Sequence, residues 1–497
     1  MRGPMFLGLE PSCFPRGEGV AAQAFLVRLG VARLHQAQVW FYDLAFEFMK
    51  PYLRTIDRES WDEFIAHFRG EKLKKNLAAR RDILDGWLPG LDDSGRLLVR
   101  MNGFPKAEKS NTDSTNDMYV VMSKDTEKPR FICSPDPIFL AAIGPYTHAQ
   151  TKWLSKEFHH RKRLYYAGCS TPQELTEWLN LTIQELPEPW SLVDDITAMD
   201  SNHSKESFGY HRKVRKIQFP RLTLWIQRAY DGEETVVVSV GRYRFKVEFV
   251  NASGVPDTSY KNSAMCIPVR LIAVAHGYRD IRTMSQEALM QYLVDVKNSI
   301  FSAASGDDGI TRLPDYVCGI STLEFSIDRY NQAWAWAGFS VKTAILPPNK
   351  WRMATFLAMR PVWSGEKYEW AVEPARRLRN MFWQIDNSMH GAAWARGVAS
   401  QVLGHSGHCY VINKICSWFL DNTSGARAEV DTINPYSPFY GMKTEGKLNE
   451  RAIQEFMLDY HVDKYDMQVF ESLLRSSSAV LVNFDCQLLR RVFSEES

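Results

Sequence analysis

The sequence predicts an α+β protein built from two or three lobes. Its 497 residues exceed the length of an ordinary single domain and can form a large buried core. Helical spacing recurs in the first and last parts of the chain, whereas apolar, β-branched and aromatic residues that partly alternate with polar ones mark a middle stretch. Apolar residues make up 45% of the chain and charged residues 24%, as in ordinary soluble globular proteins.

The first half of the chain is expected to alternate helices with loops before a strand-rich stretch. Helical spacing predicts helices over residues 22–50 and 58–84. The polar run 109–117 predicts an exposed mobile loop. Strands are expected at 222–227 and 234–251, where apolar and β-branched residues dominate.

The second half is expected to be mostly helical. Leu289, Leu293 and Val296 lie at helical spacing in a stretch over 285–303 that leads into a turn at Gly306. A second amphipathic helix is expected over 320–338, and Gly338 would end it. From residue 366 onward the pattern predicts mainly helices.

Charge is balanced overall but clustered locally. The net charge is +2, yet basic residues gather in four short runs, at 72–81, 159–163, 212–221 and 376–379. Such a distribution suits a closed channel that holds phosphates inside and stays neutral outside. A solvated helix face explains each single run equally well, so both interpretations stay open.

The cysteines and the apolar runs bear on the setting of the protein. Eight scattered cysteines without a CxxC pair indicate reduced thiols in a cytosolic setting. His405, His408, Cys409 and Cys416 suggest zinc only faintly, because their spacing matches no known finger. We expect no signal peptide and no integral membrane segment, since no run approaches the ~18 apolar residues that span a bilayer.

Three short segments, in a fixed order, carry the chemistry. They are Asp195-x4-Asp200, Ser253-Gly254-x3-Thr258-x3-Asn262 and Gly306-Asp307-Asp308. Two separated acidic segments suit a nucleotidyl transferase in which two Mg²⁺ ions lie about 4 Å apart. Asp195 and Asp307 are the expected metal ligands, with Asp308 adjacent and secondary; Mn²⁺ could replace Mg²⁺. Asp194 competes with Asp195, but as its neighbour on a strand it should face the opposite way.

The middle segment is expected to recognise a ribose. Asp200 and Asn262 together can hold a 2′-hydroxyl, which both donates and accepts hydrogen bonds. Ser253 and Gly254 should form a flexible loop that lets the template approach closely, and Thr258 belongs to the same segment. A helix cap or a core amide is the alternative role for Asn262. Gly-Asp-Asp-Gly309 is likewise ordinary turn chemistry.

These motifs and their order resemble the palm motifs A, B and C of viral RNA-dependent RNA polymerases, most closely those of the tombusvirus and nodavirus branch of positive-strand RNA viruses. Around them, residues 104–109 and 128–132 resemble motif F, residues 338–342 resemble motif D, and residues 356–360 take the place of motif E. The resemblance covers residues 60 to 380. The serine- and alanine-rich stretch 302–305 and the lack of Cys-Ser in motif E depart from the family pattern.

The resemblance assigns roles to further basic residues. Motif F implies that Lys106, Lys109 and Arg130 hold the incoming nucleoside triphosphate. Motif D implies that Lys342 protonates the departing pyrophosphate. The segment before motif F implies template contacts for Lys72 and Lys75, and motif E implies that Arg360 contacts RNA.

The resemblance also implies a right-hand fold of fingers, palm and thumb. The expected fingers span residues 1–189 with an insertion at 206–250. The palm, an antiparallel sheet backed by helices, spans 190–205 and 251–364, and a mainly helical thumb spans 365–497.

The implied activity is template-directed RNA synthesis for replication of a positive-strand RNA genome. The implied partners are template RNA, the nascent strand, NTPs and a separate membrane-anchored viral replication protein, which would bring the chain to membranes in the host cytoplasm. Two alternatives stay open. A reverse transcriptase is disfavoured by Asp200 and Gly306, and an inactive RNA-binding scaffold is disfavoured because no metal-binding aspartate is missing.

Overall fold

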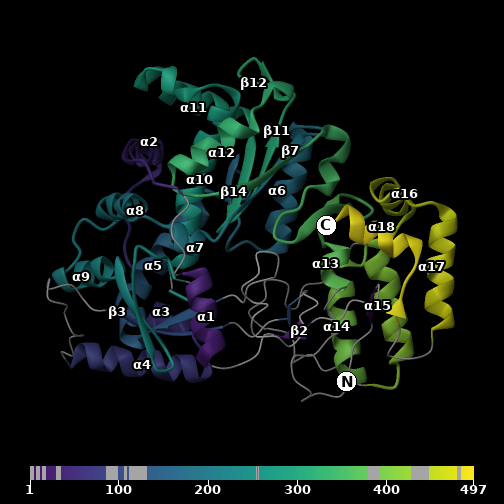
Figure 1. Ribbon diagram of the computed structural model, residues 1–497, viewed down its shortest axis with the longest axis horizontal. Coiled ribbons are helices and arrows are strands. Elements are labelled where there is room, and N and C mark those ends of the chain that lie inside the picture. Colours follow the sequence, from purple (N-terminus) through teal and green to yellow (C-terminus); the bar gives the residue numbers. More distant parts are fainter. Residues whose placement is uncertain are drawn as a thin grey trace.

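The computed structural model describes residues 5–6, 12–13, 18–29, 35–85, 99–105, 109–110, 131–252, 254–255, 257–378, 391–426, 447–477 and 483–496. A central sheet with its helices lies between a lobe formed largely by the N-terminal third and a helical C-terminal lobe (Figure 1). Each of the three parts has its own buried apolar cluster. This mixture of helices and sheets confirms the α+β class.

The central sheet has five strands in the order β14-β7-β11-β10-β6. They are β6 (Leu164–Tyr166), β7 (Trp190–Ile196), β10 (Phe301–Ser305), β11 (Asp308–Leu313) and β14 (Val341–Leu346). The pairs β14–β7, β7–β11 and β11–β10 are antiparallel. The edge strand β6 instead runs parallel to β10. The antiparallel sheet expected from the sequence is therefore present over four strands, and its fifth strand departs from it.

Alternating side chains cover both faces of this sheet. Leu192, Ala304 and Leu313 belong to the cluster on one face, with the helices α10 (Thr258–Tyr278), α11 (Gln286–Ser299) and α12 (Ile327–Trp336). Tyr165 and Ile310 belong to the cluster on the other face. That face carries α6 (Pro172–Glu185) and the hairpin of β15 (Met359–Trp363) with β16 (Tyr368–Val372).

The helix expected over 285–303 is wrong in its last residues. α11 ends at Ser299, and β10 begins at Phe301, where every second side chain turns to the opposite face. Ser302 and Thr311 are buried, and their hydroxyls hydrogen-bond to each other at 2.9 Å across β10 and β11. This pairing satisfies the polar groups that make the strand less apolar than the family pattern.

The N-terminal lobe is built on a second sheet, in the order β5-β3-β8-β9. Its strands are β3 (Val99–Pro105), β5 (Phe131–Pro135), β8 (Thr235–Val240) and β9 (Tyr243–Glu248). The hairpin β8–β9 confirms the strands expected at 234–251, and its parallel pairing with β3 joins residues 235–248 to the N-terminal third.

The strand expected at 222–227 is wrong. The Thr223 hydroxyl accepts a hydrogen bond from the Ile226 N–H and caps α9 (Leu224–Gly232). Ile226, Ala229 and Tyr230 then bury one helical face against the second sheet. A cap followed by spacing of three and four residues outweighs the strand preference of the apolar residues.

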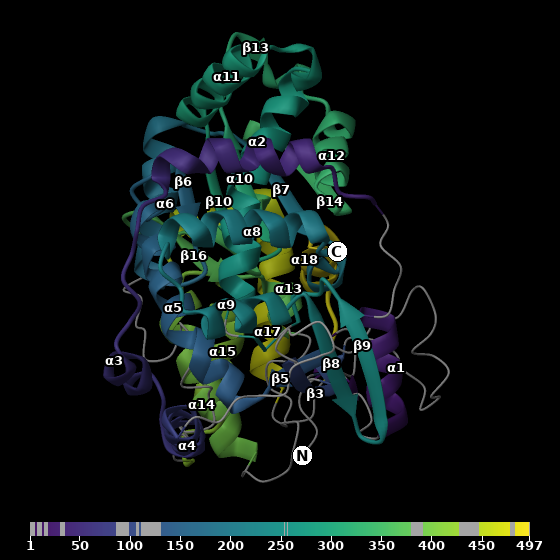
Figure 2. The same ribbon diagram turned by 90° about the vertical axis from the view of Figure 1, so that its left-hand side faces the viewer.

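Both long helices expected near the N-terminus are divided. The first becomes α1 (Glu18–Arg28) and α2 (Val39–Met49), and the second becomes α3 (Trp61–Ala66) and α4 (Gly70–Leu84). Ser60 and Glu63 form a capping box that starts α3. Helix α2 lies across α10 and packs against α8 (Lys205–Gln218) (Figure 2).

The C-terminal lobe is mainly helical, as predicted, after the strand β16. Its helices are α13 (Pro374–Leu378), α14 (Gly391–Ser406), α15 (Tyr410–Asn422), α16 (Glu450–Asp459), α17 (Lys464–Ser476) and α18 (Gln487–Glu495). The short strand β1 (Met5–Phe6) pairs in parallel with β17 (Asn483–Phe484), so the beginning of the chain contacts this lobe.

Short elements complete the fold. The stretch 320–338 is helical only in part, because β13 (Ile320–Ser321) and η4 (Thr322–Glu324) precede α12; Gly338 follows with φ +91°. The other short elements are η1 (Lys50–Tyr52), η3 (Ile281–Thr283), β12 (Tyr316–Val317) and η5 (Pro348–Met353). The thiols of seven cysteines are free: Cys133, Cys169, Cys266, Cys318, Cys409, Cys416 and Cys486.

Candidate active site

The register of the central sheet brings the two acidic segments together. Asp195 on β7 lies directly opposite Asp308 on β11, and on its other side it lies opposite Lys342 on β14. Directly paired residues point to the same face, with Cβ atoms about 4.5–5.5 Å apart. Asp307 sits in the adjoining turn, where its carbonyl accepts the Ile196 N–H at 3.3 Å. Three carboxylates and one lysine therefore lie at one end of the sheet. Asp195 and Asp307 are exposed there.

Asp194 faces the opposite way, as the alternation along a strand predicts. Its carboxylate is 1% exposed and accepts a bidentate pair of hydrogen bonds from Arg270 on α10, at 2.8 Å from Nε and 2.5 Å from Nη2. The Tyr330 hydroxyl on α12 also donates to Asp194. These bonds fix β7 to two helices and leave Asp195 as the carboxylate that faces outward.

Gly309 gives the Arg270 guanidinium its room. A Cβ at this position would lie 1.9 Å from Arg270 Nη2, which no side chain tolerates. The glycine after the two aspartates therefore serves the packing beneath the turn. In the sequence, Arg270 stands out only as the one charged residue in the apolar run 264–275.

The charge on Asp308 is poorly compensated by the protein itself. Burial raises the pKa of its carboxyl to about 7, although a hydrogen bond from the Leu357 N–H at 2.7 Å favours the ionised form. The neighbouring Asp307 and Asp194 raise the pKa further, and Arg270 lowers it. A site that gathers carboxylates with this little compensation fits hard divalent cations such as Mg²⁺.

The three aspartates nevertheless form no compact cluster of ligand atoms. Among the described residues, the one group of three acidic, histidine or cysteine side chains whose ligand atoms all lie within 4.8 Å is Glu59, His67 and His148. Carboxylates that serve two ions spread more widely than the ligands of one ion. The faint zinc pattern at 405–416 forms no such group either.

The residues expected to recognise a ribose converge. Asp200 lies on α7 (Met199–Asn202) and accepts a hydrogen bond from Asn262 Nδ2 on α10 at 3.2 Å. Asn262 Oδ1 accepts from Asn251 Nδ2 at 2.6 Å and lies 2.9 Å from His203 Nε2. His203 and Asn251 are buried and were not singled out from the sequence. They fix which end of the Asn262 amide faces Asp200.

Helix α10 also contacts the turn that carries Asp307. The Ser263 hydroxyl, one residue after Asn262, accepts the Gly306 N–H at 2.8 Å. Gly306 has φ +66°, a conformation that glycine adopts without strain. One helix thus joins the candidate ribose site to the acidic turn.

The rest of the middle segment lies just before α10. Thr258 Oγ1 donates to the carbonyls of Ala252 and Val255, at 2.9 and 3.0 Å. Gly254 has φ +112°, and a Cβ there would lie 2.3 Å from the Cys133 carbonyl oxygen on β5. Ser253 lies outside the described residues.

The basic residues expected to bind NTP and template are only partly described. Lys106 and Arg130 lie outside the described residues, and Lys109 belongs to the short strand β4 (Lys109–Ser110), paired with β2 (Ser12–Cys13). Lys72 and Lys75 are exposed on α4.

The basic run at 212–221 contacts other parts of the protein instead of forming an open charged surface. Arg212 pairs with Asp231 and Glu234, and Lys213 pairs with Asp43. The Arg215 guanidinium lies 3.7 Å from the centre of the Tyr230 ring.

Arg360, which motif E implies contacts RNA, is a buried side chain in the structure. It is 2% exposed on β15, and its guanidinium lies 4.4 Å from the centre of the Tyr460 ring and 4.0 Å from Asp459. A buried cation needs such partners. The side chain therefore holds the C-terminal lobe against the hairpin β15–β16.

No protein-family model and no curated protein matches this sequence. Within the described part of the chain, none of the helices has the length and apolar character that crossing a bilayer requires.

Proposed function

We propose that the chain is an RNA-dependent RNA polymerase of the right-hand type, and that it adds ribonucleoside monophosphates to an RNA 3′-end. The observation that carries the proposal is the strand register that sets Asp195 between Asp308 and Lys342, with Asp307 in the adjoining turn. In this proposal the central sheet with its helices is the palm, the N-terminal lobe is the fingers, and the C-terminal lobe is the thumb. The contact between β1 and β17 suits a hand whose fingers touch its thumb.

Asp195 and Asp307 would hold two Mg²⁺ ions, and Asp308 would support them. Bound Mg²⁺ supplies positive charge where negative charge develops on the attacking 3′-oxygen and on the leaving pyrophosphate. Lys342 borders Asp195 on the side away from Asp308, where its ammonium group can donate a proton to the leaving group. The buried Asp194–Arg270 pair holds β7 in place and takes no part in the transfer.

Asn262 and Asp200 would select ribose over deoxyribose. Their side chains are already joined by a hydrogen bond, and His203 and Asn251 orient the amide. A 2′-hydroxyl can join this network as both donor and acceptor. A deoxyribose offers neither, so the network favours RNA synthesis over DNA synthesis and disfavours the reverse-transcriptase alternative.

The proposed activity implies several binding partners. Template RNA, the nascent strand and NTPs would bind the site, and a separate membrane-anchored viral replication protein would bring the chain to membranes in the host cytoplasm. The process served would be replication of a positive-strand RNA genome.

Incorporation of labelled NTPs on a homopolymer RNA, in Mg²⁺ or Mn²⁺ and with or without primer, tests the proposal. We expect Asp307→Ala to lower incorporation at least about a hundredfold, because loss of one charge-stabilising group costs about that much. RNA affinity should stay close to that of the wild type, since the carboxylate does not bind template.

Asp328→Asn is the matched control, because Asp328 is exposed on α12 of the same part of the molecule. It should synthesise RNA at the wild-type rate. Near-normal synthesis by Asp307→Ala would contradict the two-metal site. A wild-type protein that binds RNA but incorporates no nucleotide under any of these conditions would favour an RNA-binding scaffold.

A further inference from the structure

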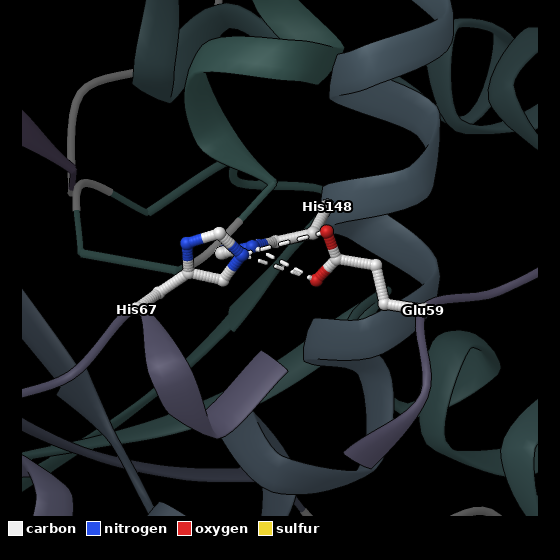
Figure 3. A group of neighbouring side chains, drawn as sticks. All are labelled: Glu59, His67 and His148. Carbon is white, nitrogen blue, oxygen red and sulfur yellow. Dashed lines mark hydrogen bonds and ion pairs between the residues drawn. The ribbon is translucent and has the colours of Figure 1, made fainter. Parts of the chain in front are cut away.

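A histidine and carboxylate cluster lies in the N-terminal lobe, apart from the acidic turn. Glu59 precedes α3, His67 follows the last residue of α3, and His148 lies on α5 (Pro137–Glu157). Figure 3 shows the two imidazole rings and the carboxylate directed toward one another. None of these residues takes part in the proposed polymerase chemistry.

Close packing of α3 on α5 creates the cluster. A Cβ on Gly144 of α5 would lie 2.2 Å from the Phe64 ring, so only glycine lets α3 approach this far. The Glu59 N–H donates to the Pro145 carbonyl at 3.1 Å and fixes the carboxylate beside the same helix. His148 follows Gly144 by one helical turn and packs edge-on against Phe64.

The distances suit ligands of one tetrahedral ion better than hydrogen bonds. Glu59 Oε2 lies 3.4 Å from His67 Nε2 and 3.4 Å from His148 Nδ1. Hydrogen bonds between such atoms are commonly about 2.9 Å long. Ligand atoms about 2.05 Å from a tetrahedral Zn²⁺ are separated by roughly 3.3 Å. The separation found is that of two ligands on one ion.

Burial of the carboxylate points the same way. The Glu59 side chain is 4% exposed, and its Oε2 has no hydrogen-bond partner within the described residues. Lys152 Nζ lies 2.5 Å from the other oxygen, Oε1, which is also 3.4 Å from His67 Nε2, while Oε2 faces both imidazoles. The His67 and His148 side chains are 43% and 31% exposed, which leaves an open side for a fourth ligand.

We propose that Glu59, His67 and His148 bind one Zn²⁺ ion, with water as the fourth ligand. Two imidazoles and one carboxylate suit zinc, whereas Mg²⁺ prefers oxygen ligands. The ion joins α5 to the connection between α3 and α4, and thereby steadies the helix that carries Lys72 and Lys75. The inference does not depend on the proposed polymerase activity.

Zinc titration of the chelator-stripped full chain, in competition with a chromophoric chelator, tests the proposal. We expect the wild type to bind one equivalent, and its Tm to rise with free Zn²⁺, because an ion that binds only the native state stabilises it. His67→Ala, His148→Ala and Glu59→Gln should each weaken this binding at least about a hundredfold. Loss of a residue that merely supports a metal ligand already costs about 10–100-fold.

His35→Ala is the control, because His35 is exposed and lies outside the cluster. It should bind zinc as the wild type does. Without zinc, the two histidine variants should keep the wild-type Tm to within a few degrees, since both histidines are partly exposed. If a histidine variant unfolds, the comparison rests on Glu59→Gln, which preserves the side-chain shape. A wild type without a zinc equivalent, or equal binding by wild type and ligand variants, would overturn the proposal.

Discussion

Asp194 and Asp195 are chemically identical neighbours in opposite surroundings. Because successive side chains on a strand point to opposite faces, one carboxylate meets the Arg270 guanidinium and the other faces outward. Removing one partner of a buried ion pair costs about 3–5 kcal/mol of stability, whereas removing an exposed carboxylate costs little. The first aspartate therefore serves the fold, and the second is available to a ligand.

Sugar selection should depend on Asn262. Asn262→Ala removes the amide that joins Asp200, Asn251 and His203, and with it the three hydrogen bonds of this network. We expect discrimination between ATP and dATP to fall by about 1–3 kcal/mol, since the network that would hold the 2′-hydroxyl is lost. The measurement is the ratio of kcat/KM for the two nucleotides.

Asn298→Ala, at an exposed position on α11, is the control for this substitution and should keep the wild-type ratio. Asp200→Ala should change the ratio in the same direction as Asn262→Ala. If neither alters it, both residues are structural, and Asn262 is then the core amide that its burial also allows.

At the scale of elements, the sequence predicts best where one local signal acts alone. Partial alternation of apolar and β-branched residues predicted the hairpin at 234–251, and glycine predicted the end of the helix before Gly338. The strand predicted at 222–227 is wrong because a threonine cap and a helical burial pattern competed with β-branched and aromatic residues. The predicted end of the helix over 285–303 is wrong because apolar spacing does not distinguish the last helical turn from a buried strand.

The candidate site divides in the same way. Asp195, Asp307 and Asn262 stand in short segments that resemble a family pattern, so the sequence indicates them. Arg270, Ser263 and His203 act through contacts between elements that only the folded chain brings together, so no local sequence pattern predicts their roles. Interactions that support a site depend on packing, which a sequence motif does not encode.

Helix α4 should bind RNA through Lys72 and Lys75. Both side chains are exposed on this helix. Each lysine that neutralises a phosphate of single-stranded RNA adds about 0.7 to the slope of log affinity against log salt. We expect Lys72→Ala/Lys75→Ala to weaken binding of a short RNA uniformly across sequences and to reduce this slope by about 1.4.

The double variant Lys156→Ala/Lys464→Ala is the control, because these lysines are exposed on α5 and α17 and lie outside the four basic runs. It removes the same charge and should leave the slope close to that of the wild type. A slope unchanged by loss of Lys72 and Lys75 would assign both lysines to a solvated helix face.

At the scale of the whole molecule, a buried charge cluster joins the N-terminal lobe to α10. Lys261 on α10 is ion-paired with Asp257, at 2.8 Å, and with Glu233 at the end of α9. All three side chains are buried. Two carboxylates share one ammonium group here, so one negative charge is only partly compensated.

Stability should therefore fall as pH rises toward neutrality. Burial, and then the charge of Asp257, raise the pKa of Glu233 from 4.5 to about 7. Between these two values the native state binds more protons than the unfolded state, so its stability falls as pH rises. Glu233→Gln should remove this part of the pH dependence and stabilise the protein above pH 7 by about 1–3 kcal/mol. The measurement is the difference in Tm between variant and wild type, at pH 5 and at pH 8.

Glu324→Gln, at an exposed position, is the control and should show no such pH-dependent difference. A Glu233→Gln protein whose Tm differs from that of the wild type equally at both pH values would show that Glu233 ionises normally in the native state.

The position of the C-terminal lobe should depend on Arg360. Its buried guanidinium contacts Asp459 and the Tyr460 ring at the end of α16, while Arg352 holds Asp459 at 2.7 Å. Arg360→Met should destabilise the protein by about 3 kcal/mol, because it removes one partner from a buried charge network. The lobe should also become more sensitive to limited proteolysis. Arg490→Met breaks an exposed pair with Asp485 and should leave the Tm close to that of the wild type. Below the melting range, the salt dependence of RNA binding should be the same for Arg360→Met and the wild type. A smaller slope at an unchanged Tm would instead restore Arg360 as an RNA-binding residue.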